Sequence, residues 1–90
     1  MHTVVREVRF ERELHRLQPN LRRADEFVEG AEWVLARDPK TGYQVREGSP
    51  VWCLCINREL SLHPAVIYYT FDESHVYFLS IQVVTRNGKQ

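Results

Sequence analysis

The chain has no excess of charge of either sign and no long run of apolar residues. Twelve lysine and arginine side chains balance twelve aspartate and glutamate side chains. A protein that binds nucleic acid mainly by neutralising phosphates usually carries a clear basic excess, so such binding would need a local basic patch here. No stretch of about 18 apolar residues is present, so we expect no membrane-spanning helix.

The N-terminal segment MHTVVREVRF also lacks the continuous apolar stretch of a secretory signal peptide, because charged residues interrupt it. We therefore expect a cytoplasmic protein. A chain of 90 residues that is 43% hydrophobic and 27% charged suits one globular domain, spanning residues 1–90.

Cysteine is scarce, and the two cysteines, Cys53 and Cys55, lie two positions apart in an apolar run. On a strand this spacing places both thiols on one face. A disulfide between them would be strained, and two thiols are too few ligands for a zinc site. We predict that both are buried and act as small hydrophobic side chains, with redox or metal chemistry as the alternative. No cofactor or metal is expected.

The strongest local pattern is a pair of apolar runs near the C-terminus, Ala65–Phe71 and Val76–Val84, separated by Asp72-Glu73-Ser74-His75. Both runs are rich in β-branched and aromatic residues, which pack well on a pleated surface and lose rotamer freedom in a helix. Together they predict a β-hairpin. Few positions alternate cleanly to polar residues, which indicates a sheet covered on one face by helices and only partly open on the other.

The N-terminal half predicts one strand followed by two helices. Thr3–Phe10 has the alternation of a short strand, and the spacing of Phe10, Leu14 and Leu17 predicts a short amphipathic helix. Leu21–Arg37 carries apolar residues at intervals of three and four, which is typical of a longer helix. Asn20 is suited to be its N-cap.

A strand-like region follows from Tyr43 and includes Val51–Ile56, which is apolar on both faces and therefore suits an interior strand. Asn57–Pro64 is polar and irregular, which indicates a linker. The predicted fold class is α+β: two N-terminal helices packed on a small antiparallel sheet, in the order β-α-α-β-β-β.

This order, the segment ADEFVEGAEWVLARDPKTGYQV and the hairpin VIYYTFDESHVYFLSIQVV resemble the RelE/ParE superfamily of bacterial type II toxins. The resemblance implies an antitoxin partner that wraps the toxin. It also implies one of two activities. RelE-like members cleave mRNA in the ribosomal decoding site, with basic residues and often a tyrosine or histidine. ParE-like members inhibit DNA gyrase and lack that catalytic set.

By this resemblance, the candidate catalytic residues of a RelE-like mRNA endonuclease are Arg58, Arg86, Tyr69 and His63. The arginines would stabilise phosphate charge, the histidine would transfer a proton and the tyrosine would stack on a base. Ala65 stands where these toxins commonly carry an arginine. Each candidate also has a plainer interpretation: solvated surface arginines, a loop histidine and a core tyrosine.

Two other functions stay open. A ParE-like inhibitor would bind a protein target and would expose an apolar patch, for example around Trp33 and Trp52. A degenerate member without toxicity would serve as an interaction module or homodimer. A cluster of Arg58, Arg86 and a tyrosine or histidine would distinguish the nuclease from both.

Overall fold

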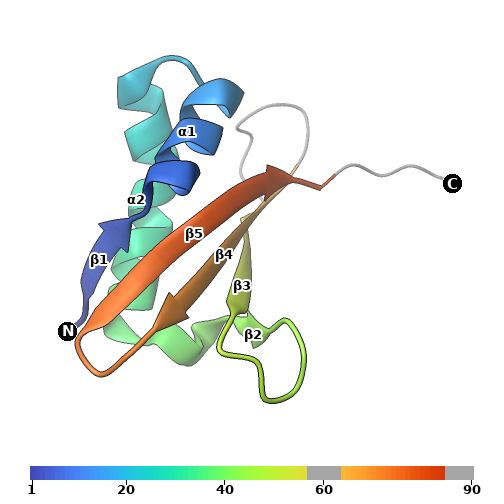
Figure 1. Cartoon of the computed structure of the whole chain (residues 1–90). Helices are drawn as coiled ribbons and strands as arrows, with labels where there is room; N and C mark the ends of the chain where they lie inside the picture. Colours follow the sequence, from blue (N-terminus) through green and yellow to red (C-terminus); the bar gives the residue numbers. More distant parts are fainter. Residues whose placement is uncertain (57–63, 85–90) are drawn as a thin grey trace, which may run out of the picture.

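Two helices pack on one face of a five-stranded sheet in the computed structural model, which describes residues 1–56 and 64–84 (Figure 1). The strands are ordered β1-β5-β4-β3-β2 across the sheet. The elements are β1 (Thr3–Arg6), α1 (Val8–Leu17), α2 (Leu21–Arg37), the 3-10 turn η1 (Pro39–Thr41), β2 (Tyr43–Gln44), β3 (Trp52–Ile56), β4 (Ala65–Phe71) and β5 (His75–Val83). The α+β class and the predicted order are confirmed, with the region from Tyr43 to Ile56 forming two strands.

The sheet is mixed rather than wholly antiparallel. β2, β3, β4 and β5 pair antiparallel with their neighbours, whereas β1 lies parallel to β5, with Thr3 opposite His75 and Arg6 opposite Phe78. The alternation of side chains along a strand is the same in both kinds of pairing, so the sequence pattern did not indicate the direction of β1.

The boundary between β1 and α1 differs from the prediction. The strand ends at Arg6 instead of Phe10, and α1 begins at Val8. Phe10 and Leu14 are the buried residues of α1. In this segment the helical spacing of apolar residues therefore predicted the structure correctly, and the strand-like alternation from Glu7 to Phe10 did not. The longer helix α2 has the predicted bounds, and Asn20 caps it by accepting a hydrogen bond from the backbone N–H of Arg23 at 3.1 Å.

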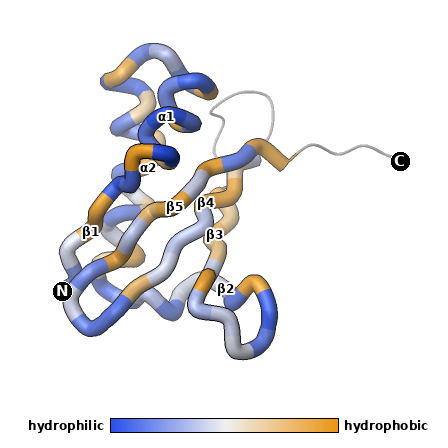
Figure 2. The backbone as a smooth tube through the Cα atoms, in the orientation of Figure 1, coloured by the Kyte–Doolittle hydropathy of each residue, from blue (hydrophilic) through white to orange (hydrophobic). Residues whose placement is uncertain are grey.

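The core lies between the helices and the sheet. Fully or nearly fully buried apolar side chains come from α1, α2, β4 and β5, and in Figure 2 hydrophobic segments recur along the strands. Its members are Phe10, Leu14, Ala24, Phe27, Val28, Ala31, Leu35, Ala65, Ile67, Tyr69, Val76, Phe78 and Ile81. The rings of Phe10 and Phe78 meet at a centroid distance of 5.1 Å. This contact fastens α1 to β5.

The predicted hairpin is confirmed as β4 and β5. In its turn, the carboxylate of Asp72 accepts hydrogen bonds from the backbone N–H groups of Ser74 and His75, each at 2.8 Å. These two bonds lower the pKa of Asp72. A bulge interrupts the pairing, because Tyr68 lies opposite Ser80 while Tyr69 lies opposite Phe78. None of the described helices is both long enough and apolar enough to cross a membrane.

Candidate functional site

The helices leave one face of the sheet uncovered, and Figure 1 shows α2 behind the sheet as seen from that side. Ala65, Ile67 and Tyr69 of β4 are buried in the core, so the residues that alternate with them face away from the helices. Residues paired across strands share a face. By this register, the open face consists of Thr3, Val5, Tyr43, Cys53, Cys55, Val66, Tyr68, Thr70, His75, Tyr77, Ser80 and Gln82, of which Val66 and Ser80 are buried.

No residue of the open face is a lysine, arginine, aspartate or glutamate. Three tyrosines, Tyr43, Tyr68 and Tyr77, give it an aromatic character, and the ring of Tyr77 stacks on His75 at 5.7 Å. Phosphate binding depends on cations, whereas tyrosine supplies large, rigid contact area with a hydroxyl at its end. In the described part of the chain, this face is therefore built for apolar and aromatic contacts.

One cation is turned away from the open face and held by acids under the helices. Arg6 donates to Glu32 and Asp25 at 2.8 Å each and lies 3.4 Å from Glu11. Burial opposes the charge of Arg6, but the hydrogen bonds to Glu32 and Asp25 outweigh it and raise the pKa of Arg6. This arginine joins β1 to both helices, and its guanidinium is engaged by three carboxylates.

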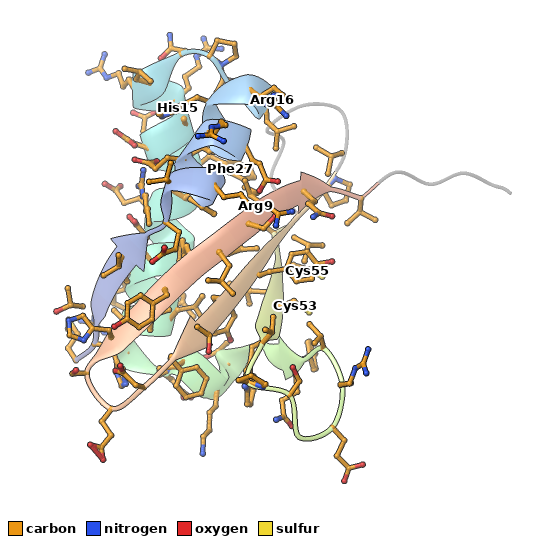
Figure 3. The ribbon with its side chains drawn as sticks, viewed as in Figure 1. Arg9, His15, Arg16, Phe27, Cys53 and Cys55 are labelled. Carbon is orange, nitrogen blue, oxygen red and sulfur yellow. The ribbon has the colours of Figure 1, made fainter. Side chains whose placement is uncertain are left out.

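A second cation lies at the border of the open face, where α1 meets β5 (Figure 3). Arg9 of α1 pairs with Glu13 at 3.3 Å. Glu13 in turn accepts hydrogen bonds from the Ser80 hydroxyl at 2.6 Å and the Ile81 backbone N–H at 3.1 Å. β1 pairs with β5 only as far as Phe78, so α1 and its glutamate close the edge of β5 beyond that point.

Tyr69 lies in the core and not on the open face. Its side chain is fully buried, its hydroxyl donates to the carbonyl of Pro39 at 2.6 Å, and it accepts from the N–H of Gly42 at 3.2 Å. Burial raises the pKa of Tyr69 to about 12. The side chain has no free surface on which a base could stack, so this part of the predicted site does not fit; the tyrosine that reaches the open face is Tyr68.

Position 42 requires glycine because the end of η1 packs closely against β3 and β4. A Cβ atom at this position would collide with the carbonyl oxygen of Cys53 and would lie 2.6 Å from the hydroxyl of Tyr69. Glycine therefore permits the contact that satisfies the hydroxyl group of Tyr69.

The other predicted catalytic residues, Arg58, His63 and Arg86, lie outside the described residues, so their clustering stays a prediction. Ala65, the position where RelE-like toxins carry an arginine, is fully buried on the helix-facing side of β4. It pairs with Ile56 and Val83. A longer, charged side chain at this position would enter the core, not the open face.

The prediction that both cysteines are buried is wrong. Both thiols are free; Cys55 is exposed and Cys53 is half-buried. β3 is apolar on both faces, but only the face with Trp52, Leu54 and Ile56 packs against the core. Burial raises the pKa of the Cys53 thiol, and the neighbouring Cys55 adds to the shift.

Trp33 and Trp52 do not form the predicted patch. Trp33 is 59% exposed on α2, and the guanidinium carbon of Arg37 lies 3.9 Å from its ring centroid, a cation–π contact. Trp52 packs against the core, with its ring 5.5 Å from that of Phe71.

An apolar groove lies instead between α2 and β3. It has a volume of about 460 Å³. Its lining residues are Phe27, Gly30, Ala31 and Val34 of α2 and Leu54, Cys55 and Ile56 of β3. β2 pairs only with Trp52 and Cys53, so in the described residues the outer edge of β3 from Leu54 onward has no strand beside it. An apolar floor next to a free strand edge is a surface to which a peptide can bind.

No protein-family model matches the chain, and no curated protein does. Among solved structures, a chain in the crystal structure of the toxin–antitoxin complex RelBE2 from Mycobacterium tuberculosis is similar, with a TM-score of 0.71 and 23% sequence identity. The match covers 92% of this chain and 91% of that chain. It shows that the two chains share a fold and is consistent with the resemblance noted in the sequence.

Proposed function

We propose that this chain is the toxin component of a type II toxin–antitoxin pair and that it acts by binding a protein target across the open face, without cutting RNA. The similar solved structure is a toxin–antitoxin complex, which supports the first part. The observation that carries the second part is the absence of lysine, arginine, aspartate and glutamate from the described strand residues of the open face.

RNA cleavage would require cationic and proton-transferring side chains on the open face. Attack by a 2′-hydroxyl needs a base for its proton, cations for the crowded phosphate charge and an acid for the leaving oxygen. Among the described strand residues, the open face supplies tyrosine, threonine, cysteine and histidine side chains but no lysine or arginine. Tyr69 is enclosed in the core, and Arg6 is neutralised by three acids.

The same face suits a protein target. Tyrosine is enriched among the residues that dominate protein–protein affinity, and Tyr43, Tyr68 and Tyr77 are distributed over three strands of one face. A target such as DNA gyrase, the one bound by ParE-like toxins, would place the protein in the cytoplasm.

The antitoxin is proposed to bind the groove between α2 and β3. A peptide strand there would pair with the free edge of Leu54–Ile56, and its apolar side chains would cover Phe27 and Val34. This site meets the open face at Cys55, which lines the groove and also belongs to the open face, so the two partners would bind adjoining surfaces.

Induced expression tests the toxin assignment. The wild-type chain should slow growth, and the double variant Tyr68→Ala/Tyr77→Ala should not, whereas Trp33→Ala, which removes an exposed aromatic ring from α2, should remain toxic. Sequencing of mRNA 5′ ends in the same cells should show no new cleavage. Unimpaired growth with the wild-type chain would contradict toxicity and would favour an interaction module or homodimer.

The alternative is a ribosome-associated mRNA endonuclease that uses Arg58, Arg86 and His63. It predicts new 5′ ends within ribosome-bound mRNA that disappear in Arg58→Ala and Arg86→Ala. That result would overturn the binding mechanism while keeping the toxin assignment.

Gly30→Leu tests the antitoxin site. A Cβ at Gly30 would have no heavy atom within 4 Å, and glycine costs about 1 kcal/mol in a helix interior, so the variant should fold at least as well as the wild type. The added side chain should obstruct the groove and abolish neutralisation by the antitoxin, whose gene we expect beside this one. Glu29→Leu, at the adjacent exposed position of α2, is the matched control. Full neutralisation of Gly30→Leu would exclude this groove.

A further inference from the structure

The two cysteines form a pair on the open face, and the proposed function gives their thiols no chemical role. Cys53 and Cys55 are the only cysteines of the chain, and Figure 3 shows them on β3. Alternate residues of a strand point the same way, with Cα atoms about 6.6 Å apart. Cys55 also lies beyond the residues that pair with β2, so nothing described crosses over it on that side.

The strand prevents the two thiols from joining to each other. A disulfide requires Cβ atoms about 3.5–4.5 Å apart, closer than alternate positions of an extended strand allow. A four-ligand zinc site is also absent from the described residues, because no group of three His, Cys, Asp or Glu side chains gathers there. The residues paired with Cys53 are Tyr43 and Tyr68, and Val66 is paired with Cys55.

A cation that accepts two ligands in line fits this spacing better. Two metal–thiolate bonds of about 2.3 Å, placed end to end, join sulfurs about 4.6 Å apart. Rotation of both cysteine side chains toward each other brings the thiols of alternate positions into that range. Thiolate is a soft ligand and selects Cu(I) among the biological cations that tolerate so few ligands.

Charge favours a monovalent cation as well. Two thiolates without a metal would place two negative charges side by side on a face whose described strand residues include no lysine or arginine. A Cu(I) ion between them leaves one net negative charge. Tyr43, Tyr68 and Val66 flank the two cysteines across the neighbouring strands, and Cys55 itself is exposed, so an added metal ion can reach the thiols.

We propose that Cys53 and Cys55 form a two-coordinate Cu(I) site on the open face. Two S–Cu bonds form as both S–H bonds break, and the two protons pass to solvent. The oxidation state of copper and sulfur is unchanged, so no oxidant or reductant takes part. The proposal does not depend on the toxin assignment, since it concerns only these two side chains and their strand.

Anaerobic titration of the reduced protein with Cu(I), in competition with bicinchoninate, tests the site. We expect one copper per chain, two protons released per copper, and X-ray absorption showing two sulfur neighbours. Cys53→Ser and Cys55→Ser should each weaken binding by at least about 100-fold, because loss of a ligand exceeds the 10–100-fold effect of altering its surroundings. Thr70→Ser, on the open face of β4, should bind as the wild type does.

Two results would overturn the site. Undiminished affinity in the double variant Cys53→Ser/Cys55→Ser would place the copper elsewhere. One copper per two chains, with a dimer that appears only when copper is added, would mean that each chain supplies a single thiolate. Circular dichroism of every variant ensures that a loss of binding is not a loss of fold.

Discussion

The two faces of this sheet differ in charge: the ion pairs lie on the face that the helices cover, and not among the strand residues of the open face. The face under the helices holds the apolar core and also a charge network in which Arg6 meets three acids. The face without helices has no lysine, arginine, aspartate or glutamate among its described strand residues and carries three tyrosines and two thiols. Charged side chains therefore attach the helices to the sheet, whereas the described strand residues of the open face are uncharged apart from the titratable His75.

Adjacent residues of a strand have different roles, because one side chain points into the core and the next points to the open face. Tyr69 bonds to Pro39 and Gly42 inside the molecule, whereas Tyr68 faces outward. Phe78 contacts Phe10, whereas Tyr77 stacks on His75 at the surface. Variants at adjacent positions should therefore separate effects on stability from effects on binding.

The largest difference is expected between Phe78→Ala and Tyr77→Ala. Phe78 is fully buried, so its truncation leaves a cavity and should lower the free energy of unfolding by about 3–5 kcal/mol. Tyr77 is only half-buried, and its truncation should cost less than about 1 kcal/mol. Urea unfolding followed by circular dichroism measures both. Equal losses would mean that the open face is covered in solution.

The second comparison is between two arginines of the N-terminal half. Arg6→Ala removes two short charged hydrogen bonds, to Glu32 and to the exposed Asp25, and should cost about 2 kcal/mol. Arg9 is 69% exposed in its pair with Glu13, so Arg9→Ala should change stability by less than about 1 kcal/mol. Thermal unfolding of both variants at low and high salt measures the two stability losses. If high salt largely removed the loss in Arg6→Ala, the ion pairs of Arg6 would be exposed to solvent.

The third comparison isolates one hydroxyl group. Tyr69→Phe leaves the carbonyl of Pro39 and the N–H of Gly42 without their buried partner and should cost about 2 kcal/mol. Tyr68→Phe removes a hydroxyl from the open face and should leave stability unchanged. Hydrogen exchange at the Gly42 amide should accelerate only in Tyr69→Phe; protection of that amide in the variant would show that another acceptor replaces the phenol.

The sequence was sufficient where one pattern had one structural meaning. The intervals of three and four in Leu21–Arg37 predicted α2 with its bounds, and Asn20 was identified as the cap from its residue type alone. The two β-branched runs around Asp72 predicted the hairpin. In these segments, local propensity and tertiary packing favour the same element.

The sequence was insufficient wherever both faces of a strand are apolar. In β3 and β4 the alternation gives no sign of which face the helices cover, so the sequence leaves open whether Tyr68 or Tyr69 lies in the core, names Tyr69 as the candidate site residue and predicts buried cysteines. In the structure Tyr69 lies in the core and the cysteines lie on the open face. Arg6 bonds to Asp25 and Glu32, which lie 19 and 26 positions further along the chain, and β1 pairs with β5 at the other end of the sequence. No local sequence pattern encodes contacts over such separations.

The smallest loss of stability is expected for a change at Glu13, whose side chain closes the edge of β5 at the border between the two faces. Burial opposes its charge, but hydrogen bonds from Ser80 and Ile81 outweigh burial and lower the pKa of Glu13 below its ordinary value of 4.5. A carboxylate with a lowered pKa in the folded state stabilises the fold fully above pH 4.5, and its contribution is lost as the pH falls through the folded-state value.

Glu13→Gln should therefore cost about 1 kcal/mol at pH 7, and this deficit should shrink as the pH falls below 4.5. Glu29→Gln, at an exposed position of α2, should show no deficit at either pH. Unfolding free energies measured from pH 7 to pH 3 provide the test. If the Glu13→Gln deficit were the same at both ends of that range, the side chain would close the strand edge by its shape and hydrogen bonding alone, and the border between the faces would owe nothing to charge.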